Sequence, residues 1–218
     1  MVTRRAGPGV ENLPSQKLAT VSTSLNCLGG YLLRDGEAFC CEHSFHSLLR
    51  CSSRFLTDIT RSYSLFSTAS SIQNNDFLIL KTARKGSFHV LTRGQKSQFY
   101  GLPDERSTWY SICSTWDSNS GLAQVWINGN PSTRKIGFKG NLDGELNIVL
   151  GQKHGSCKSF EGMITDVHMW DYVLSDGQIQ RFANDLNFTP GNVINWRALD
   201  FTIVGDVLIE DNQTNSCQ

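Results

Sequence analysis

The chain has 218 residues, of which 39% are hydrophobic and 18% charged, so it is long enough to bury a sizeable core as one or two domains. Lys and Arg together number 20, as do Asp and Glu, and a formal net charge of +0 gives no general basic field for nucleic acid or an anionic membrane. No apolar run approaches the roughly 20 residues that span a bilayer. We expect a globular protein with no membrane span and no nucleic-acid partner.

The first 50 residues carry clusters of Gly, Pro, Ser and Asn and keep no sustained helical or strand period. They predict a divergent, poorly ordered N-terminal segment over residues 1–50. Basic residues stand near the start of the chain, but no continuous apolar stretch follows them before Gln16, so no secretory signal is visible. Any case for secretion must therefore come from elsewhere in the sequence.

The seven cysteines are too irregularly spaced for the stapled framework of a small secreted scaffold, and an odd count leaves at least one unpaired. Cys113 lies in a strand-like segment, and a bridge from it would tie together two core strands, with Cys51 as its best upstream candidate. The ligand types that zinc prefers gather at Cys40, Cys41, His43, His46 and Cys51. That spacing matches no established zinc pattern, so we interpret these residues as incidental.

From about Phe55 the chain consists of short apolar runs divided by turn residues, at the spacing expected of an all-β sandwich. The predicted strands are Tyr63–Phe66, Phe77–Leu80, Phe88–Leu91, Trp109–Trp116, Ala123–Ile127, Leu146–Leu150 and Met163–Trp170. Asn128 and Gly129 follow one of these runs and predict a tight hairpin turn, because both readily take positive φ angles. The sheet should therefore be largely antiparallel.

One segment breaks this pattern and predicts a short helix. Ser175 is followed three residues later by Gln178, a capping-box arrangement, and Ile179 and Phe182 would share one helical face. The helix should end near Asn184. Two closing strands are predicted after it, over Val193–Trp196 and Phe201–Ile209, and a polar tail over 211–218.

The sequence contains no motif for enzyme chemistry. It has no Gly-x-Ser-x-Gly, no His-Glu-x-x-His and no glycine-rich phosphate loop. His89 and His168 fall inside predicted strands, where a hydrogen-bonded structural histidine is the more common case. A carbohydrate hydrolase would need two carboxylates facing one groove, such as Glu145 and Asp166, and no motif supports that pair. We predict that the protein is not an enzyme.

Two further motifs depend on context. Asn74, Asn75 and Asp76 place three oxygen-bearing side chains at a loop-to-strand junction, which suits calcium better than zinc, although the same residues dominate ordinary turns. Asn187 and Asn212 begin acceptor sequons for N-glycosylation, which matter only in a secreted chain.

Several segments, in the right order from about Thr57 to Ile209, resemble those of the short pentraxins. They are Arg61–Ser67, Gly121–Gly129, Ile148–Gln152, Met169–Ser175 and Asn192–Leu199. The family signature His-x-Cys-x-Ser/Thr-Trp-x-Ser/Thr is matched by Ser111–Ser118, with Ser111 in place of the histidine.

This resemblance implies a flattened antiparallel jelly-roll β-sandwich, lectin-like, with one short α-helix near 175–184 in a pentraxin-like domain over 51–210. It also implies a secreted cyclic homopentamer that binds phosphate-bearing or carbohydrate ligands through calcium. Cys113 matches the family's core cysteine, and Cys51 is its expected disulfide partner. A slip of one residue between Cys51 and Arg61 would turn Cys51 to the opposite face of its sheet.

Departures from the family pattern fall on the calcium segments. Asn74 stands where the family has Asp, while Asn75 is retained. Lys153, His154 and Gly155 replace Glu-Gln-Asp, and the shortened loop places Lys158 where a ligand Gln is expected. Because calcium affinity rises with anionic oxygen ligands, we expect two-ion binding to be lost. A degenerate site should remain, formed by Asn74, Asn75, Asp76 and the main chain near His154.

The expected ligand pocket departs less from the family pattern than the calcium segments do. Leu80 takes the apolar position that would contact a choline methyl cluster, and Gln95 replaces the acidic partner of that cation.

Upstream of about residue 50 the resemblance disappears, so either residues 1–50 supply replacement strands or the domain lacks its first strands. The leading hypothesis is a secreted recognition protein with weakened calcium dependence, and the alternative is a remnant that does not assemble.

Overall fold

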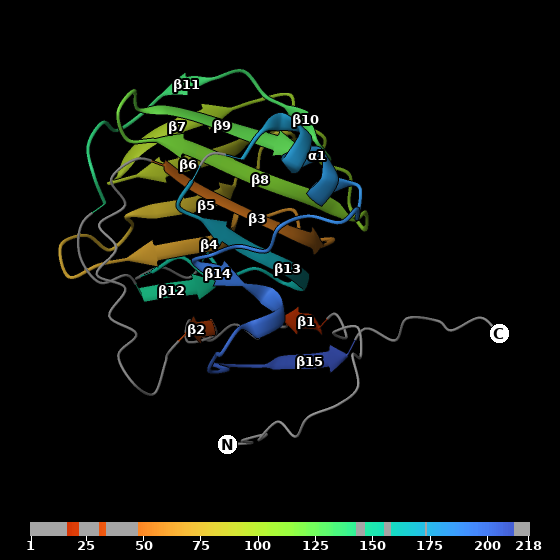
Figure 1. The fold of residues 1–218 in the computed structure, drawn as a ribbon. Helices are drawn as coiled ribbons and strands as arrows, with labels where there is room; N and C mark the ends of the chain where they lie inside the picture. The colour runs from red at the N-terminus through yellow and green to blue at the C-terminus, as the bar shows by residue number, and fades with distance from the viewer. Residues whose placement is uncertain are drawn as a thin grey trace, which may run out of the picture.

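The computed structural model of the protein describes residues 17–21, 31–33, 48–142, 147–154, 158–172 and 174–211, which form two packed β-sheets (Figure 1). The strands of the first sheet are β1 (Lys17–Val21), β3 (Leu48–Leu56), β8 (Tyr110–Asp117), β9 (Leu122–Ile127), β10 (Asn130–Pro131), β11 (Lys135–Ile136), β13 (Gly162–Trp170), β14 (Ile194–Asn195) and β15 (Val207–Asp211). Those of the second are β2 (Tyr31–Leu33), β4 (Tyr63–Ala69), β5 (Phe77–Lys81), β6 (Phe88–Thr92), β7 (Gln95–Phe99) and β12 (Asn147–Leu150).

The main path of the first sheet runs β10-β9-β8-β3-β13-β1-β15, and the second sheet runs β2-β12-β4-β5-β6-β7. All of these strand pairs are antiparallel. The fold class predicted from the sequence, an antiparallel jelly-roll sandwich, is confirmed.

Side chains that alternate along the strands fill the space between the two sheets. Phe77 and Ile79 of β5 and Phe88 of β6 face Ile112 and Trp116 of β8, all with at most 1% of their surface exposed. Aromatic and β-branched residues suit such a half-buried pleated surface, which is why these runs form strands. The core therefore depends on apolar runs that are visible in the sequence.

The predicted hairpin turn is present between β9 and β10. Asn128 and Gly129 take φ angles of 49° and 75°, and Ile127 pairs with Asn130 across the turn. Pro131 lies in β10 at the end of the sheet, where the missing amide hydrogen interrupts no central ladder. Local turn chemistry is sufficient to explain this connection.

The predicted helix is also present, as α1 (Asp176–Ala183), on the outside of the first sheet and in contact with β8 (Figure 1). Ser175 and Gln178 form the capping box, and Ile179 and Phe182 are buried. Arg54 of β3 holds the far end of the helix by donating to the Phe182 carbonyl at 2.7 Å and pairing with Asp185 at 3.0 Å. Within the described residues no helix is long and apolar enough to cross a membrane.

Three strands correct the prediction that residues 1–50 are poorly ordered. β1 pairs with β13 and β15, β2 pairs with β12, and β3 begins at Leu48. The prediction is wrong for these residues because strands of five and three residues are too short to show a period. Their partners lie more than a hundred residues away in sequence. The rest of residues 1–47 and the predicted tail after Asp211 lie outside the described residues.

The closing strands are shorter than predicted. Only Ile194 and Asn195 form β14, and a 3-10 helix over Trp196–Ala198 follows. β15 begins at Val207, and it pairs with β1 along its whole length. Strand β7 was not predicted at all, because Gln95, Lys96 and Gln98 leave it with too few apolar residues to show alternation.

The register between β3 and β8 corrects the expected disulfide. Cys51 lies opposite Ser114, and Ser52 lies opposite Cys113. Residues directly opposite each other share a face, so the two cysteines point to opposite sides of the sheet. Cys51 packs in the core between the sheets, Cys113 packs with Trp126 under α1, and the structure does not join their sulfurs. The two cysteines are not bridged because the register between β3 and β8 offsets them by one residue.

Candidate functional site

The outer face of the second sheet carries Leu80, one of the residues that the sequence predicts for ligand binding. Since Phe77, Ile79, Phe88 and Val90 face the core, strand alternation turns the intervening residues outward. Cross-strand pairs then form two rows across β4, β5, β6 and β7. The rows are Ser64–Leu80–His89–Gln98 and Ser67–Leu78–Leu91–Lys96, and together they define what we call the outer face.

The segment after β12 runs beside β4 and brings a lysine to this face. The Ser67 hydroxyl donates to the Gln152 carbonyl at 2.7 Å, and the Ser64 amide donates to the Lys158 carbonyl at 3.1 Å. Because Ser64 belongs to the row that contains Leu80, this bond places Lys158 next to that row. Lys158 is exposed. Residues 155–157 of this segment lie outside the described part of the chain.

Three basic side chains meet around this row. Burial lowers the pKa of His89, and the nearby charges of Lys96 and Lys158 lower it further. A neutral imidazole beside two exposed ammonium groups can donate one hydrogen bond, while the lysines supply the positive charge. The arrangement suits an anionic group better than a metal ion.

The loop before β5 places the predicted calcium residues next to an arginine. Asp76 is fully buried, and its Oδ1 lies 3.1 Å from a guanidinium nitrogen of Arg93. Arg93 occupies the turn between β6 and β7 with φ of 48°, and its amide donates to the Asp76 carbonyl at 2.9 Å. The one carboxylate of the predicted site is therefore already compensated by a cation of the protein.

The other predicted ligands do not complete a calcium pair. Asn74 is exposed, and the Oδ1 of Asn75 is buried without a hydrogen-bond partner among the described residues. His154 Nε2 lies 3.2 Å from the Asn147 carbonyl, and burial lowers the pKa of His154 although that contact partly offsets the effect. Over the described ranges no three His, Cys, Asp or Glu residues gather at one point. With lysines at 153 and 158, these residues do not fit two divalent cations.

The structure separates the two predicted pocket residues. Leu80 is 7% exposed and belongs to the outer face, whereas Gln95 has the same parity along β7 as Ser97 and Phe99, which are buried. Gln98 is the residue that reaches the row of Leu80 and His89. The assignment of Gln95 to the ligand pocket beside Leu80 is therefore wrong. The turn at Arg93 sets the register of β7, and that register cannot be read from the sequence alone.

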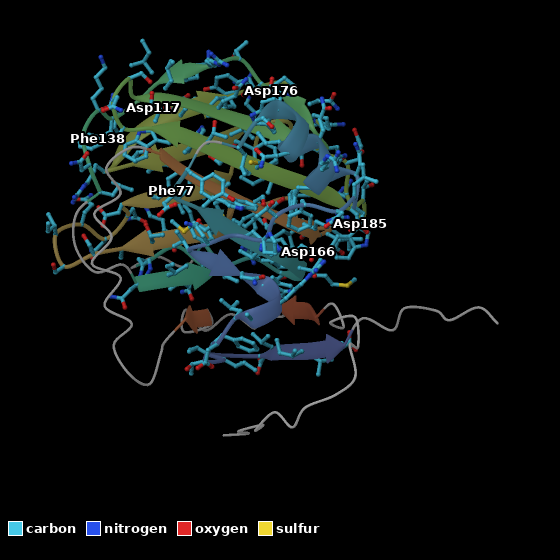
Figure 2. All side chains as sticks on the ribbon, viewed as in Figure 1. Phe77, Asp117, Phe138, Asp166, Asp176 and Asp185 are labelled. Atoms are coloured by element: carbon cyan, nitrogen blue, oxygen red, sulfur yellow. The ribbon has the colours of Figure 1, made fainter. Side chains whose placement is uncertain are left out.

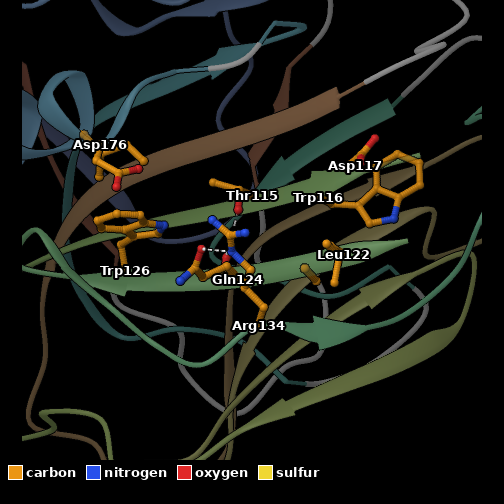
Figure 3. Close-up of a pocket in the computed structure, with 10 residues that line it drawn as sticks. Thr115, Trp116, Asp117, Leu122, Gln124, Trp126, Arg134 and Asp176 are labelled. Atoms are coloured by element: carbon orange, nitrogen blue, oxygen red, sulfur yellow. Dashed lines mark hydrogen bonds between the residues drawn. The ribbon is translucent and has the colours of Figure 1, made fainter. Parts of the chain in front are cut away.

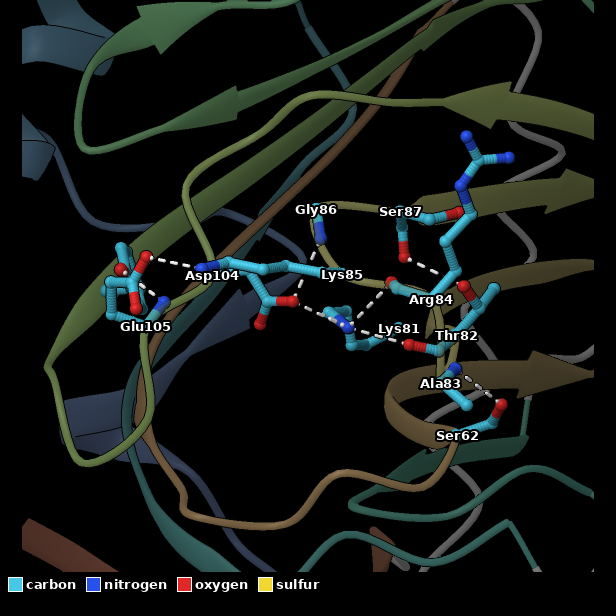
Figure 4. A network of polar contacts seen from close by, with 11 residues as sticks. Ser62, Lys81, Thr82, Ala83, Arg84, Lys85, Gly86, Ser87, Asp104 and Glu105 are labelled. Carbon is cyan, nitrogen blue, oxygen red and sulfur yellow. Dashed lines mark hydrogen bonds and ion pairs between the residues drawn. The ribbon is translucent and has the colours of Figure 1, made fainter.

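A buried ion pair fixes the β5–β6 connection beside Leu80 (Figure 4). Lys81 is 4% exposed, and its Nζ lies 2.8 Å from Asp104 Oδ2 while donating to the carbonyl of Thr82 at 2.6 Å. The Gly86 amide donates to the same carboxylate at 2.9 Å. These bonds hold one edge of the outer face in a single geometry.

The remaining predicted residues lie apart from this face. Asp166 is buried in an ion pair with Arg54 at 3.3 Å, near Asp185 and the end of α1 (Figure 2), and burial raises its pKa. Asn187 is exposed after the helix, as a glycosylation acceptor must be. The potential partner Glu145, the zinc candidates Cys40, Cys41, His43 and His46, and the second sequon at Asn212 lie outside the described residues.

Comparison with known proteins decides the family. A model of the Pentaxin (pentraxin) family matches residues 42–211. The chain belongs to the pentraxin family. The match begins upstream of the boundary at 51 that the sequence predicted and takes in the whole of β3.

Two curated pentraxins illustrate the relationship. C-reactive protein of Homo sapiens is 36% identical over 163 residues, which cover 70% of this chain and 71% of the relative. Serum amyloid P-component of Rattus norvegicus is 35% identical over 166 residues, covering 72% and 71%.

Solved structures agree on the fold. The native heptameric SAP-like pentraxin from Limulus polyphemus matches with a TM-score of 0.70 at 20% identity, covering 96% of this chain and 94% of that one. A putative carbohydrate binding protein from Bacteroides ovatus matches with a TM-score of 0.60 at 13% identity, covering 91% and 60%. At such identities the likeness concerns the pentraxin fold alone.

Proposed function

We propose that this pentraxin is a non-enzymatic recognition protein that binds phosphate-bearing or carbohydrate ligands at its outer face with little or no contribution from calcium. The observation that carries the proposal is the Arg93–Asp76 ion pair, which consumes the only carboxylate of the predicted calcium segment. The basic groups of Lys96, Lys158 and His89 support direct contact with a phosphate, because ammonium groups and an imidazole N–H are charge-compatible donors for its oxygens.

We further propose that the protein is secreted and assembles as a cyclic homo-oligomer, a pentamer by family resemblance. Its similarity to C-reactive protein and serum amyloid P-component supports this, and the Limulus pentraxin is described as heptameric. Strands β1 and β2 also support a domain that has early strands of its own, because β1 pairs with β13 and β15 and β2 pairs with β12, which favours assembly over the alternative of a non-assembling remnant.

Binding to immobilised phosphocholine tests the ligand proposal. The protein should be retained equally in calcium and in EDTA, and Lys158→Gln should weaken retention by about fivefold, as expected for loss of one charge-assisted hydrogen bond. Lys139→Gln is the matched control, because Lys139 is exposed and does not belong to the outer face. Retention that requires calcium, or that both variants reduce equally, would contradict the proposal.

Sedimentation velocity tests the assembly. A ring-sized species supports the recognition protein, whereas a monomer or an aggregate supports the remnant.

A further inference from the structure

The opposite side of the sandwich contains a cavity of about 170 Å³ between α1 and strands β8 and β9 (Figure 3). Its floor is formed by the cross-strand neighbours Thr115 and Gln124 together with Trp126. Asp176 lines it from the first turn of α1, and Arg134 lines it from the connection between β10 and β11. The cavity lies on the first sheet, so it is separate from the outer face described above.

Two residues with hydrogen-bond donors, Trp126 and Arg134, line this cavity. Trp126 is only 5% exposed, and its Nε1 is buried with no hydrogen-bond partner among the described residues. Unpaired buried donors of this kind are rare in native proteins. Figure 3 shows the nitrogen edge of the indole directed toward Thr115 and the guanidinium of Arg134, whose Nε donates to Gln124 at 3.4 Å. A carboxylate placed between them could accept from the indole and the guanidinium.

The negative charge available in the cavity belongs to Asp176. Asp117 also lines the cavity, but its carboxylate already accepts from the Asn119 amide at 3.0 Å and from the Ser120 hydroxyl. Asp176 is exposed and takes part in none of the described ion pairs. It can therefore accept from a ligand ammonium, and it would repel a dianion such as phosphate.

We infer that this pocket binds a small zwitterion of the α-amino acid type with an apolar side chain. The ligand carboxylate accepts from Trp126 Nε1 and Arg134, and its ammonium donates to Asp176. Leu122, Ile179 and the indole offer the apolar surface that the side chain contacts. The inference goes beyond the proposed function and does not depend on it, because the two sites lie on different sheets.

Titration with L-leucine, followed by the indole N–H resonance of Trp126 in ¹⁵N-labelled protein, tests the inference. We expect saturable movement of that resonance with a Kd of about 1 mM, appropriate to one partly exposed charge pair and a few hydrogen bonds. Leucinamide lacks the carboxylate and 4-methylpentanoate lacks the ammonium, so each should bind at least about tenfold more weakly. No movement at about 10 mM L-leucine, or equal binding of leucinamide, would overturn the inference.

Matched variants test whether Arg134 and Asp176 contact the two charged groups of the ligand. Arg134→Gln should weaken L-leucine binding by about tenfold, whereas Lys135→Gln, at the neighbouring exposed cation outside the cavity, should leave it unchanged. Asp176→Asn should weaken binding similarly, with the exposed Asp58→Asn as control. All four positions are exposed, so the variants should fold, and equal effects within either pair would overturn the assignment.

Discussion

The pKa of His168 is set by the residues that bury its side chain. Its ring is fully buried in β13, with centroids 5.1 Å from Phe188 and 6.2 Å from Phe182, and its Nδ1 accepts from the Gly191 amide at 3.3 Å. Burial, followed by the charge of Arg197, lowers the pKa of His168 to about 4. The neutral imidazole is therefore the form that the folded protein requires.

This lowered pKa predicts acid sensitivity. Between pH 6.5 and 4 the unfolded chain binds a proton at His168 that the folded protein does not, so the free energy of unfolding falls as the pH falls. The loss between pH 7.0 and 4.5 should be about 2 kcal/mol. Urea unfolding of the wild type and of His168→Asn, which keeps an acceptor for Gly191, measures it. An identical pH dependence in both proteins would contradict the assignment.

The ion pair between Arg93 and Asp76 predicts a strong dependence of each residue on the other. Arg93→Gln leaves the Asp76 carboxylate buried without its cation and should destabilise the fold by about 3 kcal/mol. Combining it with Asp76→Asn should recover part of that loss, which chemical unfolding of the single and double variants measures. Lys85→Gln, at an exposed pair with Glu105, is the control and should leave the unfolding midpoint unchanged. Additive effects at 93 and 76 would argue against the pair.

At the scale of elements, the register of β3 against β8 decides the chemistry of two cysteines. The side-chain period of a strand is two, so a shift of one residue moves a cysteine from one face to the other. The Cys51 thiol is buried in the core, and this burial raises its pKa well above the usual range. Such a thiol reacts slowly, because the thiolate is the nucleophile.

We therefore expect Cys51 and Cys113 to remain unbridged to each other. Peptide mapping under non-reducing conditions should recover each cysteine without a link to the other. In native protein at pH 8, Cys51 should be alkylated far more slowly than in denaturant. A peptide that joins Cys51 to Cys113 would instead place β3 one residue away from the register described here.

At the scale of the whole molecule, the loss of calcium ligands predicts that calcium does little for stability. Stabilisation by a ligand follows the ratio of its concentration to its dissociation constant. A residual site of millimolar class, built on Asn75, Asp76 and nearby carbonyls, should raise the thermal midpoint by no more than about 2 °C at about 1 mM calcium. Differential scanning fluorimetry in calcium, magnesium and EDTA measures this. A large shift specific to calcium would mean that ligands outside the described residues restore the site.

Local interactions let the sequence determine much of the fold. Strands β4, β5, β6, β8, β9 and β13 contain short apolar runs, and the turn at Asn128–Gly129 and the capping box of α1 depend on residues only a few positions apart. The resemblance to pentraxins likewise follows from contiguous segments. The resemblance also assigned Leu80 and the lysine substitutions at 153 and 158 to the proposed ligand-binding region.

Tertiary structure alone decided what depends on distant partners. β1 and β2 are too short to show a period, and they become strands by pairing with β13, β15 and β12. The same holds for the polar strand β7, which places Gln98 rather than Gln95 on the outer face. Arg93 compensates Asp76 because a turn brings them together, and Trp126 lines a cavity only once α1 packs nearby. A strand's register and a buried charge's partner are set by packing across the chain, which no local pattern contains.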